Sequence, residues 1–326
     1  MKFDFKVAAA TAITTTACFA GALNAQAEEG FIDTETGQVL HYIAEGKPGK
    51  PLLLFIHGAP ERAEVWQDYL KAFSRQYYAV AYTTRGYYPS SVPESVADYT
   101  VPALAADAKA VAKALGYEKF SVVGHDWGAA TAWRAAINYP SNVESAIIFG
   151  NPHPLMYARA YHELEEQREL IDAYIPAARD DIAPWTREGT LVNGVAHFKD
   201  YVYTEAAQEA MPWSLGLDLE RTWTENDGAS IEAIYNHYKA LDWPLTTLNT
   251  CNPVPTFSLT VNQPVLVMYG DNDRFNSAKA YELGNNDCTP NAEYVEYDGG
   301  DHWIHHTHKF ESILRMKMFL FKNRYR

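Results

Sequence analysis

The chain has 326 residues, of which 47% are apolar and 13% aromatic, and this is enough to bury a large core. Its formal charge of −14 at pH 7 repels phosphate groups, so the overall charge argues against nucleic acid and anionic lipid as partners. One large domain with an inserted segment fits this length better than two equal domains.

Residues 1–27 have the pattern of an export signal. Lys2 and Lys6 precede a mostly apolar run, and Ala25-Gln26-Ala27 supplies the small residues of a cleavage site. The run is rich in threonine and too weakly apolar to anchor in a bilayer, and no later stretch approaches the roughly 20 apolar residues of a membrane span. We therefore predict cleavage after Ala27, a periplasmic or secreted protein, and no stable membrane anchor.

Continuous runs of β-branched and aromatic residues alternate with helical patterns in most of the remaining chain. Such runs are typical of strands buried on both faces of a parallel sheet. The predicted strands are Leu52–Ile56, Tyr78–Tyr82, Phe120–Val123, Ser145–Phe149 and Val265–Tyr269. The predicted helices between them are Ala63–Phe73, Pro102–Leu115 and Ala129–Asn138. This order predicts a doubly wound α/β architecture.

The alternation of strands and helices stops near Asn151. From there to residue 250 the sequence has no strong strand pattern and has helical patterns instead, at Ala158–Ile175, Gly194–Tyr203 and Ser230–Leu241. About 100 helical residues inserted between two strands predict a cap over the carboxyl edge of the sheet, where open α/β sheets bind ligands. The predicted organisation is a signal peptide (1–27), a first core segment (28–150), a helical cap (151–250) and a second core segment (251–326).

Cys251 and Cys288 are the two cysteines that remain after cleavage. In an oxidising compartment they can form one disulfide. Two unrelated buried thiols are the alternative. Both stay open at this point, because the sequence does not give the distance between the two residues.

The stretch Gly124-His125-Asp126-Trp127-Gly128 joins a predicted strand to a predicted helix. Glycines at both ends permit the strained turn of a nucleophile elbow, which exposes the central side chain above the sheet. An aspartate at that position attacks an sp³ carbon and forms an alkyl ester, which water then hydrolyses at the carbonyl of the enzyme. A helix-capping aspartate is the alternative. The flanking glycines favour Asp126 as the nucleophile.

Several motifs together resemble the epoxide hydrolase and haloalkane dehalogenase branch of the α/β-hydrolases, over residues 30–326. They are the elbow with Ala129, His57-Gly58-Ala59-Pro60, Arg85-Gly86-Tyr87 and Asn151-Pro152-His153-Pro154. The resemblance implies an α/β-hydrolase fold, a mostly parallel doubly wound sheet with an inserted helical cap. It also implies a small-molecule substrate and hydrolysis without a cofactor.

The resemblance also implies roles for residues around the nucleophile. Backbone N–H groups of Ala59 and Trp127 would form the oxyanion hole. Asp273 would be the acid that orients the base, with Asp271 as the less favoured neighbour. His302 would be the base, although Asp301 stands before it where glycine is usual. The chain order of nucleophile, acid and base is that of the family.

The histidines near the C-terminus allow a competing interpretation. His302, His305, His306 and His308 are dense enough to suggest a metal site. However, no cysteine or acidic partner completes a clear ligand pattern, and the following stretch has the pattern of a last amphipathic helix. We therefore predict neither a metal nor another cofactor.

Opening an epoxide at neutral pH requires a proton donor for the departing oxygen, and tyrosine hydroxyls can serve. Two segments resemble those that carry the family's ring-opening tyrosines, Ala173-Tyr174-Ile175 and Tyr235-Asn236-His237-Tyr238-Lys239. The resemblance implies that Tyr174 and Tyr238 bind the substrate and donate the proton, with Tyr235 as the substitute for Tyr238.

Two departures from dehalogenases favour the epoxide. Haloalkane dehalogenases hold the halide with the tryptophan after the nucleophile and a second tryptophan or asparagine, but Ala59 occupies the second position here. Fluoroacetate dehalogenases have arginine where this chain has Trp127. Conversion of an epoxide to a vicinal diol is therefore the favoured function. Haloalkane or haloacid dehalogenation and a non-catalytic secreted binding protein are the alternatives, and the sequence does not fix the oligomeric state.

Overall fold

The computed structural model describes residues 28–180, 202–225, 228–241, 250–252, 258–283 and 288–324. The predicted export signal and most of the predicted helix Gly194–Tyr203 lie outside the described residues. Within the described part of the chain, none of the helices has both the length and the apolar character needed to cross a bilayer.

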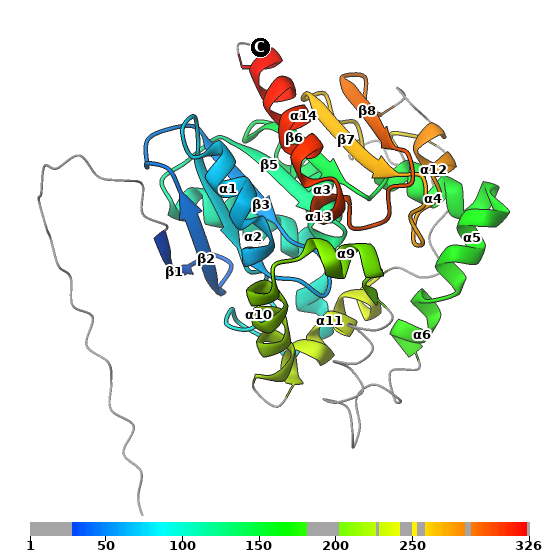
Figure 1. Ribbon diagram of the computed structural model, residues 1–326, viewed down its shortest axis with the longest axis horizontal. Helices are drawn as coiled ribbons and strands as arrows, with labels where there is room; N and C mark the ends of the chain where they lie inside the picture. The colour runs from blue at the N-terminus through cyan, green and yellow to red at the C-terminus, as the bar shows by residue number, and fades with distance from the viewer. Residues whose placement is uncertain are drawn as a thin grey trace, which may run out of the picture.

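An eight-stranded sheet forms the centre of the molecule, in the order β1-β2-β4-β3-β5-β6-β7-β8 (Figure 1). Strand β2 pairs antiparallel with β1 and β4, and all other neighbours are parallel. The strands are β1 (Glu28–Asp33), β2 (Val39–Glu45), β3 (Leu52–Ile56), β4 (Tyr78–Tyr82), β5 (Phe120–His125), β6 (Val143–Phe149), β7 (Val265–Gly270) and β8 (Ala292–Tyr297). This confirms the predicted mostly parallel sheet and its five predicted strands.

Three strands were not predicted, because none of them has a continuous apolar run. Strands β1 and β8 are partly exposed, so polar residues interrupt them. Strand β2 is buried beyond its first residue but contains His41 and Glu45. These three segments form strands because they pair with neighbouring strands, and their own composition does not indicate it.

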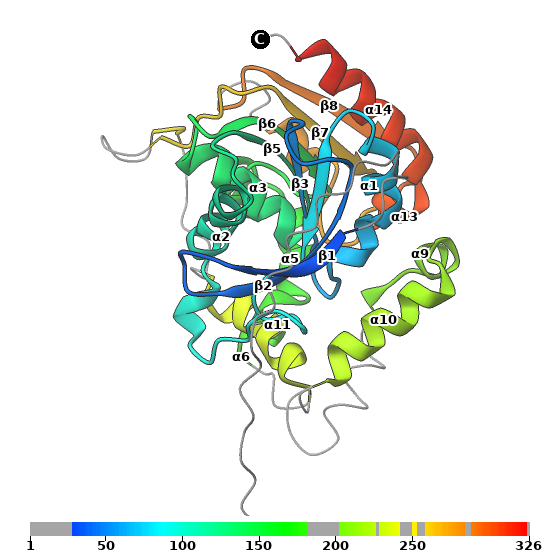
Figure 2. The ribbon, with the colours of Figure 1, turned by 90° about the vertical axis from the view of Figure 1, so that its left-hand side faces the viewer.

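Helices cover both faces of the sheet, as Figure 2 shows. One face carries α1 (Gln67–Phe73), which continues the short 3-10 helix η1 (Ala63–Trp66), and α14 (Lys309–Lys322). The other face carries α2 (Val101–Ala114) and α3 (Trp127–Asn138). Along β3, Leu53 and Phe55 pack in the first layer and Leu54 and Ile56 in the second. This two-sided burial explains the continuous apolar runs.

The helical segment lies between β6 and β7. Its described helices are α4 (Pro154–Glu163), α5 (Glu165–Asp172), α6 (Ile175–Asp180), α9 (Glu205–Ala210), α10 (Trp213–Thr224) and α11 (Ala229–Lys239), and its described residues contain no strand. The prediction of one helix over Ala158–Ile175 is wrong, because Leu164 adopts an extended conformation that separates α4 from α5.

Side-chain contacts place this segment over the carboxyl edge of the parallel strands. The Trp223 indole on α10 donates a 2.6 Å hydrogen bond to the Pro60 carbonyl, just beyond β3. The Ser230 hydroxyl on α11 accepts a 2.9 Å hydrogen bond from the Tyr88 backbone N–H, beyond β4. The helices therefore cover the end of the sheet where the predicted catalytic residues follow their strands.

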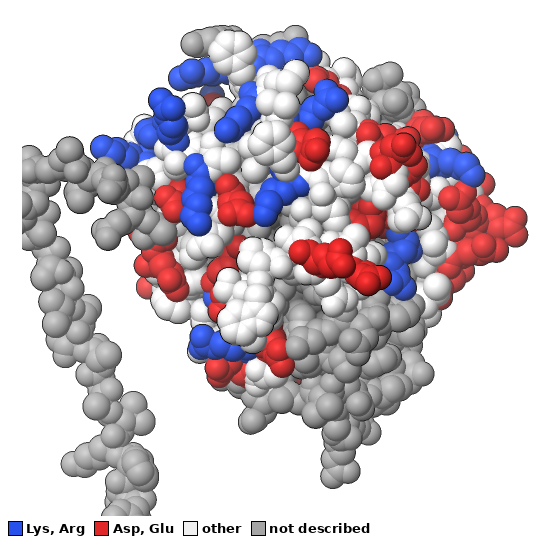
Figure 3. Space-filling view, in the orientation of Figure 1, with Lys and Arg blue, Asp and Glu red and all other residues white. Residues whose placement is uncertain are grey.

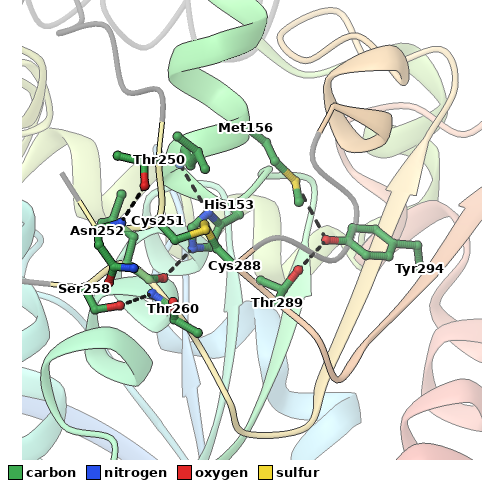
Figure 4. The surroundings of a disulfide bond; sticks show 12 residues. His153, Met156, Thr250, Cys251, Asn252, Ser258, Thr260, Cys288, Thr289 and Tyr294 are labelled. Carbon is green, nitrogen blue, oxygen red and sulfur yellow. Dashed lines mark hydrogen bonds between the residues drawn. A yellow bond between two sulfur atoms is a disulfide. The ribbon is translucent and has the colours of Figure 1, made fainter.

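Cys251 and Cys288 form a disulfide, with 5.4 Å between their Cα atoms (Figure 4). This decides between the two alternatives that the sequence left open. Beside the bond, the ring of His153 accepts a hydrogen bond from the Leu155 N–H and contacts the Leu259 carbonyl at 2.9 Å. The bridge thus ties the chain that returns from the helical segment to the loop before β8.

Candidate active site

Asp126 lies in the turn between β5 and α3, and its backbone is strained. With φ 53° and ψ −119° it is the one non-glycine residue of positive φ in the described ranges. Packing enforces the turn, because a Cβ at Gly124 would lie 2.1 Å from the Gly128 carbonyl and one at Gly128 would lie 2.2 Å from the Ile56 carbonyl. Asp126 makes no side-chain capping bond. The geometry is that of an elbow and excludes the capping alternative.

The two carboxylate oxygens of Asp126 have different partners. Oδ1 accepts a 2.8 Å hydrogen bond from the Ala59 backbone N–H, whereas Oδ2 lies 3.5 Å from Nε2 of His302. Burial by itself would raise the pKa of Asp126, but His302, His125 and the Ala59 N–H outweigh it and lower the pKa. The carboxylate is therefore ionised at neutral pH. The oxyanion role of the Trp127 N–H stays a prediction.

His302 bridges the two aspartates. Its Nδ1 lies 2.8 Å from Oδ2 of Asp273, whose Oδ1 accepts hydrogen bonds from the backbone N–H groups of Phe275 and Asn276 at 2.7 and 3.2 Å. Burial would lower the pKa of His302, but Asp273 and Asp126 reverse this and raise it from 6.5 to about 10. Asp271, the alternative acid, is exposed to solvent. The fold thus brings Asp126, His302 and Asp273 together.

Asp301, which replaces the usual glycine, has a structural use. It is buried, and its Oδ1 accepts a 3.0 Å hydrogen bond from the Trp303 backbone N–H as α13 (Ile304–Thr307) begins. Its Oδ2 accepts a hydrogen bond from the hydroxyl of Thr204, in front of α9. The carboxylate therefore connects the loop that carries His302 to the helical segment.

The two predicted tyrosines come from different cap elements and lie close together. Tyr174, before α6, and Tyr238, on α11, have ring centroids 6.2 Å apart. Tyr238 packs edge-on against Trp127 at 5.1 Å, and the hydroxyl of Tyr174 lies 3.5 Å from that of Tyr157. Tyr235, the predicted substitute, is buried in the apolar core, and its hydroxyl has no hydrogen-bond partner.

Electrostatics connect both tyrosines to the elbow. Burial, followed by neighbouring tyrosines and the charge of Asp126, raises the pKa of Tyr174 well above 10. For Tyr238, burial and then the charge of Asp126 raise the pKa, while the neighbouring Trp127 side chain opposes the rise. Both hydroxyls therefore keep their protons at neutral pH.

The sequence analysis assigned no role to four residues that support this site. The Asn151 amide donates to the Asp126 carbonyl at 3.1 Å, and the Asn276 amide donates to the Gly150 carbonyl at 3.0 Å. Phe275 contacts the rings of both Tyr174 and His302, at 5.2 and 4.8 Å, and Tyr157 is the fourth. Asn151, Phe275 and Asn276 lie just after β6 and β7, and this position at the carboxyl edge is the signal that could have identified them.

The carboxylate that the metal interpretation lacked comes from Glu61. Its oxygens lie 3.1 Å from Nε2 of His305 and 2.7 Å from Nε2 of His306, and all three residues are buried. The His305 ring packs against those of His125 and His306 in tilted pairs, with centroids 4.0 Å apart in both. Rings that radiate from one zinc ion at about 2 Å would have centroids roughly 5 Å apart. This close packing favours histidines that hydrogen-bond to one buried carboxylate.

Known proteins resemble this chain over most of its length. Residues 51–309 match the family described as alpha/beta hydrolase fold. The mouse protein named epoxide hydrolase 4 is 27% identical over 276 residues, which are 83% of this chain and 73% of that protein. A solved structure described among novel epoxide hydrolases from hot-environment metagenomes has a TM-score of 0.78 at 28% identity, covering 90% of this chain and 98% of its own. An inhibitor complex of a Bacillus megaterium epoxide hydrolase, with a TM-score of 0.76 at 24% identity over 89% and 99% of the two chains, supports the fold alone.

Proposed function

The chain belongs to the α/β-hydrolase fold family and is a hydrolase, and we propose that it converts epoxides to vicinal diols. The observation that carries this proposal is the joint placement of an elbow aspartate, a histidine–aspartate pair and two protonated cap tyrosines. The first group attacks carbon, the second activates water and the third protonates a leaving oxygen. An epoxide is a substrate that needs all three.

In the first step, Oδ2 of Asp126 attacks a ring carbon of the epoxide. A carbon–oxygen bond to the enzyme forms, the ring carbon–oxygen bond breaks, and the released oxygen takes a proton from a tyrosine. The different partners of the two carboxylate oxygens support this assignment, because the Ala59 N–H holds Oδ1 at 2.8 Å and Oδ2 is the oxygen beside His302. Oδ1 then becomes the carbonyl oxygen of the ester.

Tyr174 and Tyr238 suit the role of proton donors. Tyr238 packs on Trp127 of the elbow, Tyr174 packs on Tyr238, and the charge of Asp126 acts on both hydroxyls. At 3.5 Å the contact between the Tyr174 and Tyr157 hydroxyls is at the limit of a hydrogen bond, so a substrate oxygen can replace it.

In the second step, His302 first gives up the proton it carries in the free enzyme, which replaces through solvent the proton lost by the tyrosine. The neutral His302 then takes a proton from water, and the resulting hydroxide attacks the ester carbonyl. The negative charge forms on Oδ1, where the Ala59 N–H already points, and collapse expels the diol alkoxide, which takes the proton of the re-formed Asp126 carboxyl group. Ester formation removes the negative charge of Asp126, one of the two groups that raise the pKa of His302 to about 10. The pKa of His302 therefore falls when the ester forms, and the histidine becomes a base at the step that needs one.

Two observations argue against dehalogenation. The Trp127 side chain, which would hold a departing halide, packs edge-on against the ring of Tyr238 at 5.1 Å. The second halide-binding position is Ala59, whose backbone N–H is bonded to the nucleophile itself. A halide also needs no proton when it leaves, so the tyrosine pair would have no purpose in that reaction.

The test is to trap the ester. In His302→Ala the first step proceeds and the second does not, so a panel of aryl and alkyl epoxides should give a hydroxyalkyl adduct on the peptide that contains Asp126, measured by mass spectrometry. The matched control His302→Ala/Asp126→Ala should give none. An alkyl adduct from haloalkanes would support the dehalogenase instead. If neither class of compound gives an adduct and the wild type is inactive, the remaining alternative is the non-catalytic secreted binding protein.

We also propose that the protein is exported and cleaved after Ala27. The charged and apolar pattern of residues 1–27 supports this. The disulfide is consistent with an oxidising compartment. In a bacterial host, the periplasmic fraction should contain a chain whose intact mass begins at Glu28, and a cytoplasmic chain of full length would contradict the proposal.

A further inference from the structure

The outer face of α14 exposes a stripe of large apolar side chains. Phe310, Leu314, Met318 and Phe321 are 79, 53, 57 and 76% exposed. Their spacing confines them to roughly 80° of the helix circumference. On the opposite side, Met316, Phe319 and Leu320 are buried against the sheet. The helix is therefore apolar on two faces, and a contiguous exposed stripe of this kind is typical of an interaction surface.

Basic residues border the stripe on both sides. At 3.6 residues per turn, Lys317 falls beside one edge, and Arg315 and Lys322 fall beside the other, together with the acidic Glu311. From Lys309 to Arg324 the sequence has five basic residues and one acidic residue, Glu311. This composition contrasts with the charge of −14 of the whole chain.

The basic surface extends onto α1. The Lys317 ammonium lies 5.7 Å from the centre of the Phe73 ring, so α14 and α1 are neighbours, and α1 and its C-terminal turn expose Lys71 and Arg75. Lys50 donates hydrogen bonds to the backbone carbonyls of Ser74 and Arg75. Two of the basic side chains are paired with acids, Lys309 with Asp68 and Lys322 with Glu293, so the positive charge outside these pairs comes from the exposed Arg315, Lys317, Lys71 and Arg75.

Figure 3 shows the result on the surface. Blue side chains lie around white surface over α14 and α1, with a few red side chains among them, and red side chains gather at the right-hand edge of this view, over α5. The overall charge of −14 is thus a poor guide to the surface over α14, and it does not by itself exclude an anionic lipid there.

We propose that α14 docks the protein on the surface of an anionic phospholipid bilayer. Phe310, Leu314, Met318 and Phe321 would enter the headgroup and upper acyl region, and the bordering lysines and arginines would meet lipid phosphates. This attachment is peripheral and needs no spanning helix. A second copy fits less well, because pairing this face with itself brings two basic borders together. A nucleic acid would satisfy the charges but not the apolar stripe.

The docking face lies away from the active site. In Figure 1 the C-terminal end of α14 and the cap helices α6, α10 and α11 lie at opposite ends of the molecule. Binding through α14 therefore leaves the cap side in solution. For this reason the proposal does not depend on the proposed function, and variants on α14 are expected to keep the activity of the wild type.

The test is cosedimentation of the full protein with vesicles. Vesicles of equal phosphatidylcholine and phosphatidylglycerol should carry the protein down at about 0.1 M salt, and vesicles of phosphatidylcholine alone should not. Raising the salt to about 0.5 M should weaken binding, because the charges are exposed. About fivefold in affinity is expected for each basic residue near an anionic surface, so Arg315→Glu/Lys317→Glu should lose at least tenfold.

Matched variants separate the two components of the surface. Phe310→Ser/Phe321→Ser should also lose at least tenfold, because these side chains supply the apolar contact. Two variants elsewhere on the surface serve as controls. Trp213→Ser removes an aromatic side chain that is 80% exposed on α10, and Lys113→Glu reverses an exposed charge on α2. Neither should change binding to the vesicles. Circular dichroism and thermal unfolding check that each variant is folded.

Three outcomes would overturn the proposal. Equal sedimentation with neutral and anionic vesicles would show that charge does not determine binding. Unchanged binding of both α14 variants would show that the surface of α14 is not the membrane-binding surface. A dimer in light scattering that Phe310→Ser/Phe321→Ser converts to a monomer, with no sedimentation of the wild type, would assign the stripe to a second copy.

Discussion

The core half and the cap half of the site are built in different ways. In the core half the backbone fixes each group: Asp126 by a strained turn, and Asp273 by two backbone N–H groups that hold one of its oxygens. In the cap half, ring packing positions the tyrosines, with Tyr238 against Trp127 and Tyr174 against Phe275.

This difference separates two parts of the reaction. Side chains that backbone contacts hold in place can move little. This suits the nucleophile and the base, because the geometry they need is the same for any ester intermediate. Ring packing can adjust to neighbouring side chains, which suits the groups that receive the leaving oxygen of a particular substrate. Changes in the core half should therefore abolish turnover, whereas changes in the cap half should slow one step.

The largest effect is expected from the acid of the core half. Asp273→Ala removes the carboxylate that orients His302 and supports its charge, and kcat should fall by about 10³- to 10⁴-fold. Asp271→Ala is the matched control and should stay within about twofold, because Asp271 is exposed. Steady-state diol formation measures both. Equal losses in the two variants would show that Asp273 is not the orienting acid.

Removal of the disulfide tests how the segment that returns from the cap is held to the core. The bridge closes a loop of 37 residues. Cys251→Ser/Cys288→Ser should therefore lower the free energy of unfolding by about 4 kcal/mol, measured by urea denaturation. Because no catalytic residue contacts the bridge, the folded variant should keep its adduct formation in the His302→Ala background. Reduction of the wild type should reproduce the loss, and an unchanged midpoint would contradict the prediction.

In the cap half, Tyr174→Phe or Tyr238→Phe should slow formation of the alkyl-enzyme by about 10- to 100-fold each, because each removes one of two donors. Hydrolysis of the ester should be little changed. Rapid-quench single-turnover measurements separate the two steps. Tyr235→Phe is the control from the same helix and should leave both rates intact, since its hydroxyl has no partner. An equal effect in Tyr235→Phe would indicate that Tyr235 is the proton donor on this helix.

A further effect concerns the pH dependence of stability. The pKa of His302 is raised from 6.5 to about 10, so its contribution to folding is fully present below pH 6.5 and is lost as the pH rises through about 10. The stability difference between wild type and His302→Gln, from urea denaturation at pH 6, 8 and 10.5, should shrink with rising pH. For Tyr174→Phe the difference should stay constant up to about pH 10, because the pKa of Tyr174 lies well above 10. A constant difference for His302→Gln would contradict this assignment.

The sequence by itself determined the core half of the site and much of the sheet. Continuous apolar runs identified five strands, because burial on both faces demands apolar residues at every position. Gly124 and Gly128 identified the elbow, because close backbone contact excludes any Cβ there. These are local requirements, and local requirements can be recognised in a sequence.

Tertiary structure decided what depends on residues that are far apart in the chain. Glu61 meets His305 and His306 across about 240 positions, so no spacing rule could indicate that these histidines share a carboxylate. The disulfide needed a distance that only the fold provides. The division of surface charge is likewise a property of the fold, because a total of −14 does not show that α14 presents a basic face.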